Sequence, residues 1–422
     1  LITVDNISNV NINLNYYKYL DDMFELLRHA RKNFPLAKKA LLMRVYITLH
    51  HFAPIKAVDE CDIVLKKLKQ YKMVDDRPFC LSIMELKAHA LMNAGLYPDG
   101  EILLKEIQAD WLCNKEILSD ETLFDLYDRL AAVYRAFNLI DLSKTYNTLS
   151  ITLADKLDDD RLRALAYRTK FKITLYPNMD LSSESLRKSI EATALMPSKR
   201  IETDNSVDVC ALEILSNSTV HQDKLILKLN SMLQDIEANN LHRAQIHCFF
   251  LLAICNLLKS EEKATLLAKE YVDRAINLST SYGIVGYLWR LYNLQAIIGI
   301  RMGFDSQHIY KIFFTVFDIL KKQGLLYIGN RDACEGNILA LSNIGYYLQE
   351  HKFESQFYQT MSLVTFAGQE YSAYPNQNLS DNPVNTFLVQ QYAKARKREI
   401  LFAQNTPPNL LWDTQTRYLL IL

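Results

Sequence analysis

The stretch LAAVYRAFNLIDLSKTY, Leu130 to Tyr146, decides how this chain folds. It places a small residue at Ala131, an aromatic residue at Tyr134, a turn-forming residue at Asn138 and a second small residue at Ser143. This spacing suits two antiparallel helices, because small residues on the facing sides let the backbones approach and a large residue fills the adjoining hole. An Asn or Gly between them closes the first helix in the left-handed conformation. The stretch therefore predicts a helical hairpin.

The same spacing recurs along the chain, which makes it a packing unit rather than a site. The segment ELKAHALMNAGLYPDGEILLKEI (85–107) has the four positions at Ala88, Leu91, Gly95 and Gly100. The segment 289–313 keeps the first three at Ala296, Gly299 and Gly303, and has His308 at the fourth. The segment 343–358 keeps little beyond the aromatic residue, with Ile344, Tyr347, His351 and Gln356 at the four positions. We expect Tyr134 to be buried between helices.

Composition favours the same fold class. Gly 11 and Pro 10 are few among 422 residues, since the usual shares are about 7% and 5%. Few obligatory turns favour long helices, and no alternation of strands with helices is found. Hydrophobic residues at 49% and charged residues at 23% are typical of a globular protein. The prediction is an all-α chain, with an irregular helical bundle as the alternative to a repeat array.

Polar breaks suggest how the chain is divided. The break PSKRIETDNSVD (197–208) predicts a joint between two helical halves, 16–197 and 207–375. Residues 1–15 are expected to form a short lead-in, either a strand or irregular, and residues 386–422 a terminal helix with an apolar tail. The sequence does not begin with Met, which hints at a processed product or at a part of a larger protein.

No familiar catalytic pattern is found. The chain has no phosphate-binding glycine loop, no GxGxxG, no GxSxG and no HExxH, and its nine histidines include no pair spaced four apart. His247 and Cys248 are adjacent, so they point about 100° apart on a helix, and we interpret His247 as a satisfied core or surface histidine. Asp158 to Asp160 are expected to cap the following helix. No catalytic, cofactor-binding or metal-binding residue is therefore predicted, and no cofactor.

Charge and cysteine content limit the partners. Lys plus Arg and Asp plus Glu both number 48, so net charge gives no reason to expect nucleic acid or a membrane. The basic run KARKRE (394–399) is interpreted as a solvated helix face rather than a nucleic-acid site. The seven cysteines form no CxxC pair, which favours reduced thiols in the cytoplasm. The apolar run Cys248 to Cys255 is far shorter than the roughly 18 residues of a membrane span.

The recurring spacing resembles the tetratricopeptide repeat, with residues 130–158 as its best instance. The stretch AINLSTSYGIVGYLWRLYNLQA (275–296) is similar to the divergent repeats of MalT-type bacterial transcription activators and related signal-transduction ATPases. The residues that carry this second resemblance are Ala275, Leu278, Ser279, Gly283, Trp289 and Arg290. The resemblance extends over about 80–375 in pattern. It implies a tetratricopeptide-like α-solenoid of antiparallel hairpins, wound as a right-handed superhelix.

In such repeats the groove is lined by the first helix of each unit. Transferred to the matching positions, this implies binding residues at His89, Asp125, Asp128, Arg135, Arg290, Asn293 and Arg301, with Ser82, Glu85 and Met92 beside His89. Arg and Asn side chains there would hold a peptide main chain or a carboxylate. An ordinary solvated helix face is the alternative for each of them.

Three functional hypotheses follow. The leading one is a non-catalytic scaffold that binds a protein or peptide, acting as a sensor or regulatory module in bacterial signalling or transcription control. The ligand is then a separate protein or another domain of the same protein, and oligomerisation is left open. The second is the sensory region of a larger signalling enzyme or ATPase. The third is an all-α enzyme with an unrecognised site.

Overall fold

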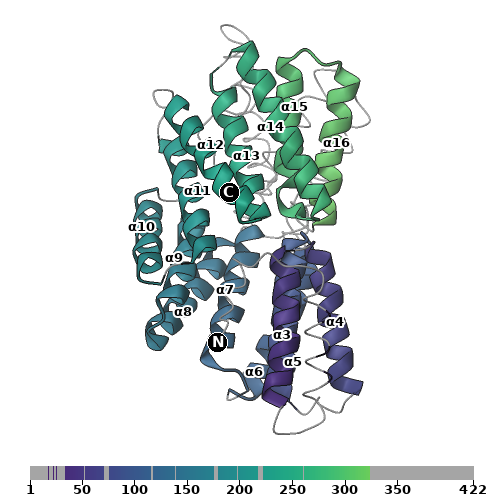
Figure 1. The fold of residues 1–422 in the computed structure, drawn as a ribbon, viewed down its shortest axis with the longest axis vertical. Coiled ribbons are helices and arrows are strands. Elements are labelled where there is room, and N and C mark those ends of the chain that lie inside the picture. Colours follow the sequence, from purple (N-terminus) through teal and green to yellow (C-terminus); the bar gives the residue numbers. More distant parts are fainter. Residues whose placement is uncertain are drawn as a thin grey trace, which may run out of the picture.

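The computed structural model describes residues 34–51, 53–70, 76–115, 117–137, 139–174, 179–196, 198–216, 222–259 and 261–323, and the single positions 18, 22 and 25. Every regular element in this described part is helical (Figure 1). Consecutive helices pack against each other as hairpins along the chain. This confirms the predicted all-α array of helix hairpins.

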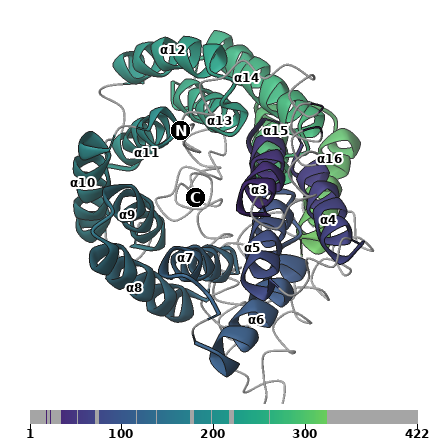
Figure 2. The same cartoon turned by 60° about the horizontal axis from the view of Figure 1, so that its bottom comes forward.

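The helices follow one another with short connections. They are α3 (Phe34–His51), α4 (Pro54–Gln70), α5 (Arg77–Asn93), α6 (Tyr97–Cys113), α7 (Asp120–Ala136), α8 (Ile140–Leu157), α9 (Asp160–Thr174), α10 (Met179–Leu195), α11 (Lys199–Ser216), α12 (Gln222–Ala238), α13 (His242–Leu257), α14 (Glu262–Ser281), η2 (Val285–Tyr287), α15 (Leu288–Arg301) and α16 (Ser306–Lys322). Figure 2 shows α7, α9, α11 and α13 on the inside of a curved array and α8, α10, α12 and α14 on its outside.

Small residues hold the hairpins together as the sequence predicts. Ser143 Oγ on α8 donates a hydrogen bond of 2.6 Å to the Ala131 carbonyl oxygen on α7. At the equivalent position in α6, a Cβ added to Gly100 would lie 3.3 Å from the Ala88 carbonyl oxygen. Tyr134 is 5% exposed and stacks on Tyr146 of α8, which confirms its predicted burial between helices.

The turns inside the hairpins use the left-handed conformation. Gly95 has φ +77° between α5 and α6, and Gly303 has φ +72° between α15 and α16, as their place in the repeat spacing predicts. Asp158 and Asn240, which the spacing did not single out, also have positive φ. Asp159 Oδ1 accepts a hydrogen bond of 3.1 Å from the Leu162 amide, so the predicted capping by this acidic run is confirmed.

The polar stretch 197–208 is not a break, which corrects the expectation from sequence. Helix α11 begins at Lys199 and runs through most of it. Its polar side chains form contacts inside the array: Asn205 Nδ2 donates to Thr193 Oγ1 on α10, and Asn205 Oδ1 accepts from Ser189 Oγ. The division into halves 16–197 and 207–375 stays a prediction. The expectations for 1–15, 343–358, 386–422 and the basic run 394–399 lie outside the described residues.

The array curves until its last hairpin contacts its early helices. One cluster of buried apolar side chains joins α5, α6 and α7 to α15 and α16, and includes Leu81, Leu130, Trp289 and Leu320. Gly95 at the α5–α6 turn meets Gln323 at the end of α16, where an added Cβ would lie 3.0 Å from Nε2. Gly286 of η2 similarly faces the Tyr97 hydroxyl. The predicted solenoid is thus present and joined to itself, while the handedness of its superhelix stays a prediction.

Candidate functional site

A cavity of about 240 Å³ lies on the inner face of the array. The inner helices α5, α7, α9, α11 and α13 all contribute to it, together with Leu49 of α3 and Pro54 of α4. Its wall contains the polar side chains His89, Asn93, Asp128, Arg129, Arg135, Arg168, Thr169, Lys172, Arg200, Asp204, His242 and Arg243. The cavity therefore brings together residues that are far apart in sequence.

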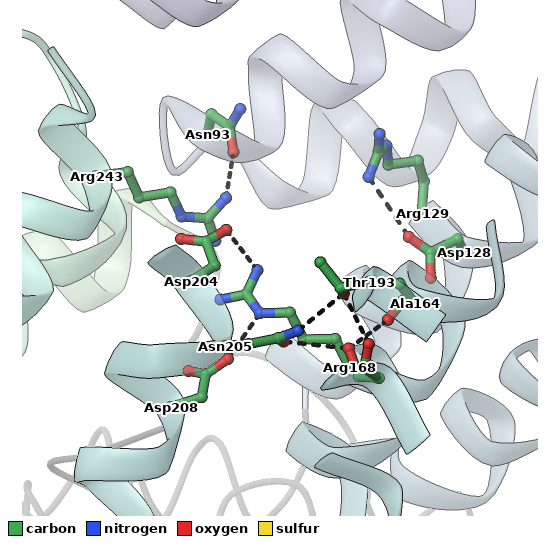
Figure 3. Close-up of polar contacts among 11 residues, drawn as sticks. Asn93, Asp128, Arg129, Ala164, Arg168, Thr193, Asp204, Asn205, Asp208 and Arg243 are labelled. Carbon is green, nitrogen blue, oxygen red and sulfur yellow. Dashed lines mark hydrogen bonds and ion pairs between the residues drawn. The ribbon is translucent and has the colours of Figure 1, made fainter. Parts of the chain in front are cut away.

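Arg168 ties α9 to α11 at one side of the cavity. Its Nη1 donates to Asp204 Oδ2 over 2.7 Å and its Nε donates to Asp208 Oδ2 over 2.6 Å (Figure 3). Asp208 is 2% exposed. Burial alone would raise its pKa, but the charges of Arg168 and Lys172 outweigh burial and lower the pKa. One guanidinium thus pairs with two carboxylates, and Asp208 also interacts with the charge of Lys172.

A second network, around Arg129, ties α7 to α5 and α9. Arg129 Nε donates to Glu85 Oε1 over 3.2 Å, and Thr169 Oγ1 donates to Asp128 Oδ1 over 2.8 Å. Arg129 Nη1 also lies 3.5 Å from Asp128 Oδ2. Burial, reinforced by neighbouring carboxylates, raises the pKa of Glu85 to about 8, and burial raises the pKa of Asp125 to about 6. One partly buried arginine therefore faces several acidic groups.

Three further cations on the cavity wall, Arg135, Lys172 and Arg243, have no hydrogen-bonded carboxylate among the described residues. In the described part of the chain, Arg135 and Lys172 form no hydrogen bond or ion pair, and Arg243 Nη1 donates only to the Asn93 amide oxygen, over 3.3 Å (Figure 3). Burial, followed by repulsion from Arg168 and Arg243, lowers the pKa of Lys172 to about 7. Burial is also the main reason why the pKa of Arg135 is lowered. Positive charge is thus concentrated here, and the charge of Asp208 compensates it only in part.

The structure brings several of the sequence-predicted residues to this cavity. His89, Asp128 and Arg135 are on its wall, as is Met92. Asp125 is beside it, one helical turn before Arg129, and interacts electrostatically with that arginine. Their role in binding stays a prediction, but their common location on the inner face follows from the repeat spacing.

The predicted residues of α15 lie elsewhere. The Arg290 guanidinium carbon is 4.8 Å from the centre of the Trp289 ring. Asn293 is 6% exposed, and Arg301 Nη1 donates to the Leu257 carbonyl oxygen over 2.7 Å at the end of α13. These residues are not on the cavity wall, because α15 is part of the hairpin that packs back on the early helices.

The basic residues Arg168, Lys172 and Arg243 were not predicted from the sequence. They belong to no motif, and the hairpins that contain them lack the full spacing of residues 130–146. The sequence nevertheless contained a signal. Asp128, Arg168 and Asp208 follow one another at intervals of 40 residues, and Arg168 and Asp208 form a hydrogen bond in the structure. Charged residues at the spacing of the hairpins indicate a shared inner face.

His247 differs from its expected environment. It is 6% exposed, and its Nε2 has no hydrogen-bond partner among the described residues, so it is a core histidine but not a satisfied one. Burial lowers its pKa to about 4. No group of His, Cys, Asp and Glu in the described ranges is arranged to hold a metal ion, and the cysteines there are free thiols. None of the described helices is long and apolar enough to cross a membrane.

Among comparisons with known proteins, only the comparison with solved structures gives matches. No family model matches the chain, and no curated protein matches it. A similar solved structure is a signal transduction ATPase with numerous domains that carries a tetratricopeptide repeat sensor, from Pyrococcus horikoshii, with 16% sequence identity and a TM-score of 0.46. The match covers 82% of this chain and 53% of that chain, so this chain aligns with about half of its length.

Proposed function

We propose that the chain is a non-catalytic scaffold that binds a protein or peptide on its inner face and acts as a sensor or regulatory module. The observation that carries this proposal is the cavity to which successive inner helices all contribute side chains. A ligand that contacts several hairpins at once changes their relative rotation, because each hairpin packs mainly on its neighbours. Binding is thereby converted into a change of curvature.

The contact between the last hairpin and the early helices supports this role. The packing of α15 and α16 on α5 to α7 couples the curvature of the array to these contacts, so a change in curvature must alter them. The array therefore has an element whose equilibrium a ligand can bias. We place this module in cytoplasmic bacterial signalling or transcription control, either as a separate protein or as the sensory region of a larger signalling enzyme or ATPase.

One observation favours the alternative of an enzyme with an unrecognised site. The carboxyl groups of Glu85, Asp125 and Asp128, all with raised pKa values, lie at or beside the cavity. However, both oxygens of Asp128 face partners, Thr169 and Arg129, and Arg129 also binds Glu85. This arrangement favours a network that holds helices together over an acid–base pair that is ready for a substrate.

The proposal is tested by co-purification from the native host, with mass spectrometry of the bound proteins. We expect a partner that is enriched with the wild-type chain and lost with Arg135→Glu, which reverses a charge on the cavity wall. Arg274→Glu is the matched control, because Arg274 is an exposed residue of the outer helix α14. A partner that both variants retain, or none with the wild-type chain, contradicts binding on the inner face.

A further inference from the structure

The charges on the cavity wall do not balance. Its basic residues are Arg129, Arg135, Arg168, Lys172, Arg200 and Arg243, and its acidic residues are Asp128 and Asp204. Arg168 is paired with Asp204 and Asp208, and Arg129 is paired with Glu85 and Asp128. In the described part of the chain this leaves Arg135, Lys172 and Arg243 without a hydrogen-bonded carboxylate, although the charge of Asp208 acts on Lys172 and Arg135 from a greater distance.

These three cations act on one another. Arg243 and Arg135 both contribute to the lowered pKa of Lys172, after burial and Arg168, and Arg243 also lowers the pKa of Arg135. Grouping like charges in a partly buried wall is unfavourable for folding, because each charge is desolvated without a hydrogen-bonded ion partner. A packed scaffold has no need of this arrangement, whereas a site for an anion requires it.

The start of α13 adds to the positive potential. Leu241, His242, Arg243 and Ala244 form part of the wall, and they are the N-cap and first turn of this helix. The N-cap residue Leu241 offers no side-chain hydrogen bond to the first amide groups. Free amide groups and the positive end of the helix dipole favour an anion at such a position.

Part of the remaining wall is apolar. Leu49, Met92, Leu165, Leu241 and Ile284 line the cavity together with the ring of Tyr97. A volume of about 240 Å³ and this mixed lining suit a small organic molecule, with an anionic group at the cations and a less polar part against the aliphatic side chains.

From this geometry we propose that the cavity binds a small molecule that carries a phosphate group, with Arg135, Lys172 and Arg243 as its ligands. A phosphate monoester has a charge of about −1.5 to −2 at pH 7, with oxygens for several donors. It balances these cations better than a single carboxylate does, and guanidinium groups pair with its oxygens in a fork. The inference rests on the proposed function in one respect: it takes the array to be a sensor, and the phosphate-bearing molecule to be the signal that this sensor binds.

Titration calorimetry with the whole chain tests the site. The probes are inorganic phosphate, ribose 5-phosphate, ribose and succinate, at pH 7 and an ionic strength of about 0.15 M. Ribose 5-phosphate is expected to bind more tightly than the other three probes. Ribose binding equally well, or succinate binding more tightly, overturns the proposal, as does no binding of either phosphate probe.

Variants locate the binding. Arg135→Gln and Lys172→Met are each expected to weaken ribose 5-phosphate binding at least about tenfold, which is the loss of one charge-assisted contact. Arg274→Gln on the outer helix α14 leaves binding unchanged. Thermal unfolding followed by circular dichroism shows whether each variant is folded, and Lys172→Met tests the site if Arg135→Gln is not. Equal affinities for the cavity variants and Arg274→Gln place the ligand elsewhere and contradict the assignment.

Failure of this inference and failure of the proposed function give different results. If neither phosphate probe binds while a protein partner still depends on Arg135, the phosphate site is wrong and the scaffold function stands. If ribose 5-phosphate binds but leaves the X-ray scattering profile and the amide exchange of α15 and α16 unchanged, the site stands and its role as a signal is wrong.

Discussion

Single residues show that the inner face of the array contains groups that are not optimal for stability. His247 is a buried imidazole with an unpartnered Nε2, and Lys172 is an ammonium group among arginines. Burial disfavours the charged form of each side chain and lowers its pKa in the folded chain, so the free energy of unfolding depends on pH. Such residues are kept when function needs them, and their effect can be measured one at a time.

The pKa of His247 is lowered to about 4 by burial, whereas an unfolded histidine titrates near 6.5. The unfolded chain therefore binds the proton more tightly, and stability is lost as the pH falls from about 6.5 towards 4. Between pH 7.5 and pH 5, His247 is expected to lower the unfolding free energy of the wild-type chain by about 2 kcal/mol, and His247→Leu should abolish this contribution. Urea unfolding at the two pH values measures it, with the exposed His308→Leu as control. The same pH dependence in wild type and His247→Leu contradicts this account.

Lys172 gives a pH dependence of the same direction, but in a higher pH range. Its folded pKa of about 7 is below the value near 10.4 of an unfolded lysine, so the wild-type chain loses stability as the pH falls from about 10 to about 7. Lys172→Met removes this loss and is expected to stabilise the unliganded chain at pH 6 by about 2 kcal/mol. Urea unfolding at pH 6 and pH 9 checks it. Lys269→Met on the outer helix α14 is the control, and a destabilised Lys172→Met chain would refute the repulsion argument.

At the scale of the element, the hairpin is the unit that the sequence encodes. Gly100 and Ser143 occupy equivalent positions and both allow a close approach to the carbonyl oxygen of a small residue on the preceding helix, Ala88 or Ala131. This close approach of the two backbones involves residues that are near in sequence, because a short turn connects the two helices. Hairpin packing is therefore sensitive to the size of one side chain.

Gly100→Val tests this directly. A Cβ at this position would lie 3.0 Å from Met92 Cγ and 3.3 Å from the Ala88 carbonyl oxygen, so the α5–α6 hairpin must open. We expect a loss of about 1–3 kcal/mol in unfolding free energy, measured by urea denaturation. Ile102→Val on the exposed side of the same helix is the control and should change stability little. If Gly100→Val and Ile102→Val changed the unfolding free energy equally, the close approach of α5 and α6 at Gly100 would be contradicted.

At the scale of the whole molecule, the array is closed by contacts between distant hairpins. The cluster that joins α5 to α7 with α15 and α16 is apolar and buried. It fixes the curvature that brings the inner helices around one cavity, so the closure and the site depend on each other. Neither is a property of any single hairpin.

Leu320→Asp is expected to open the array without unfolding its helices. Leu320 is fully buried in this cluster, and a carboxylate there cannot be paired. Small-angle X-ray scattering should show a larger radius of gyration, while circular dichroism shows retained helix content. Phe314→Asp, at a side chain that is 44% exposed on the same helix α16, should change neither. An unchanged radius of gyration for Leu320→Asp would mean that the cluster does not close the array.

Much of the local structure could be predicted from sequence. The spacing of Ala131, Tyr134 and Ser143 indicated the hairpin, and Gly95 and Gly303 indicated its turn. These features depend on contacts within a few turns of helix, and residue type and spacing specify such contacts. The stretch 197–208 was misjudged because its polar residues have partners on α9 and α10, which no local pattern reveals.

By itself, the sequence determined that this chain forms helical hairpins and that His89, Asp128 and Arg135 share one side of them. Only the tertiary structure decided that Lys172 and Arg243 join them around a cavity, and that Arg290, Asn293 and Arg301 do not. The physical reason is curvature. The position of each inner face depends on small rotations accumulated from hairpin to hairpin and on the packing of the last hairpin against the early ones.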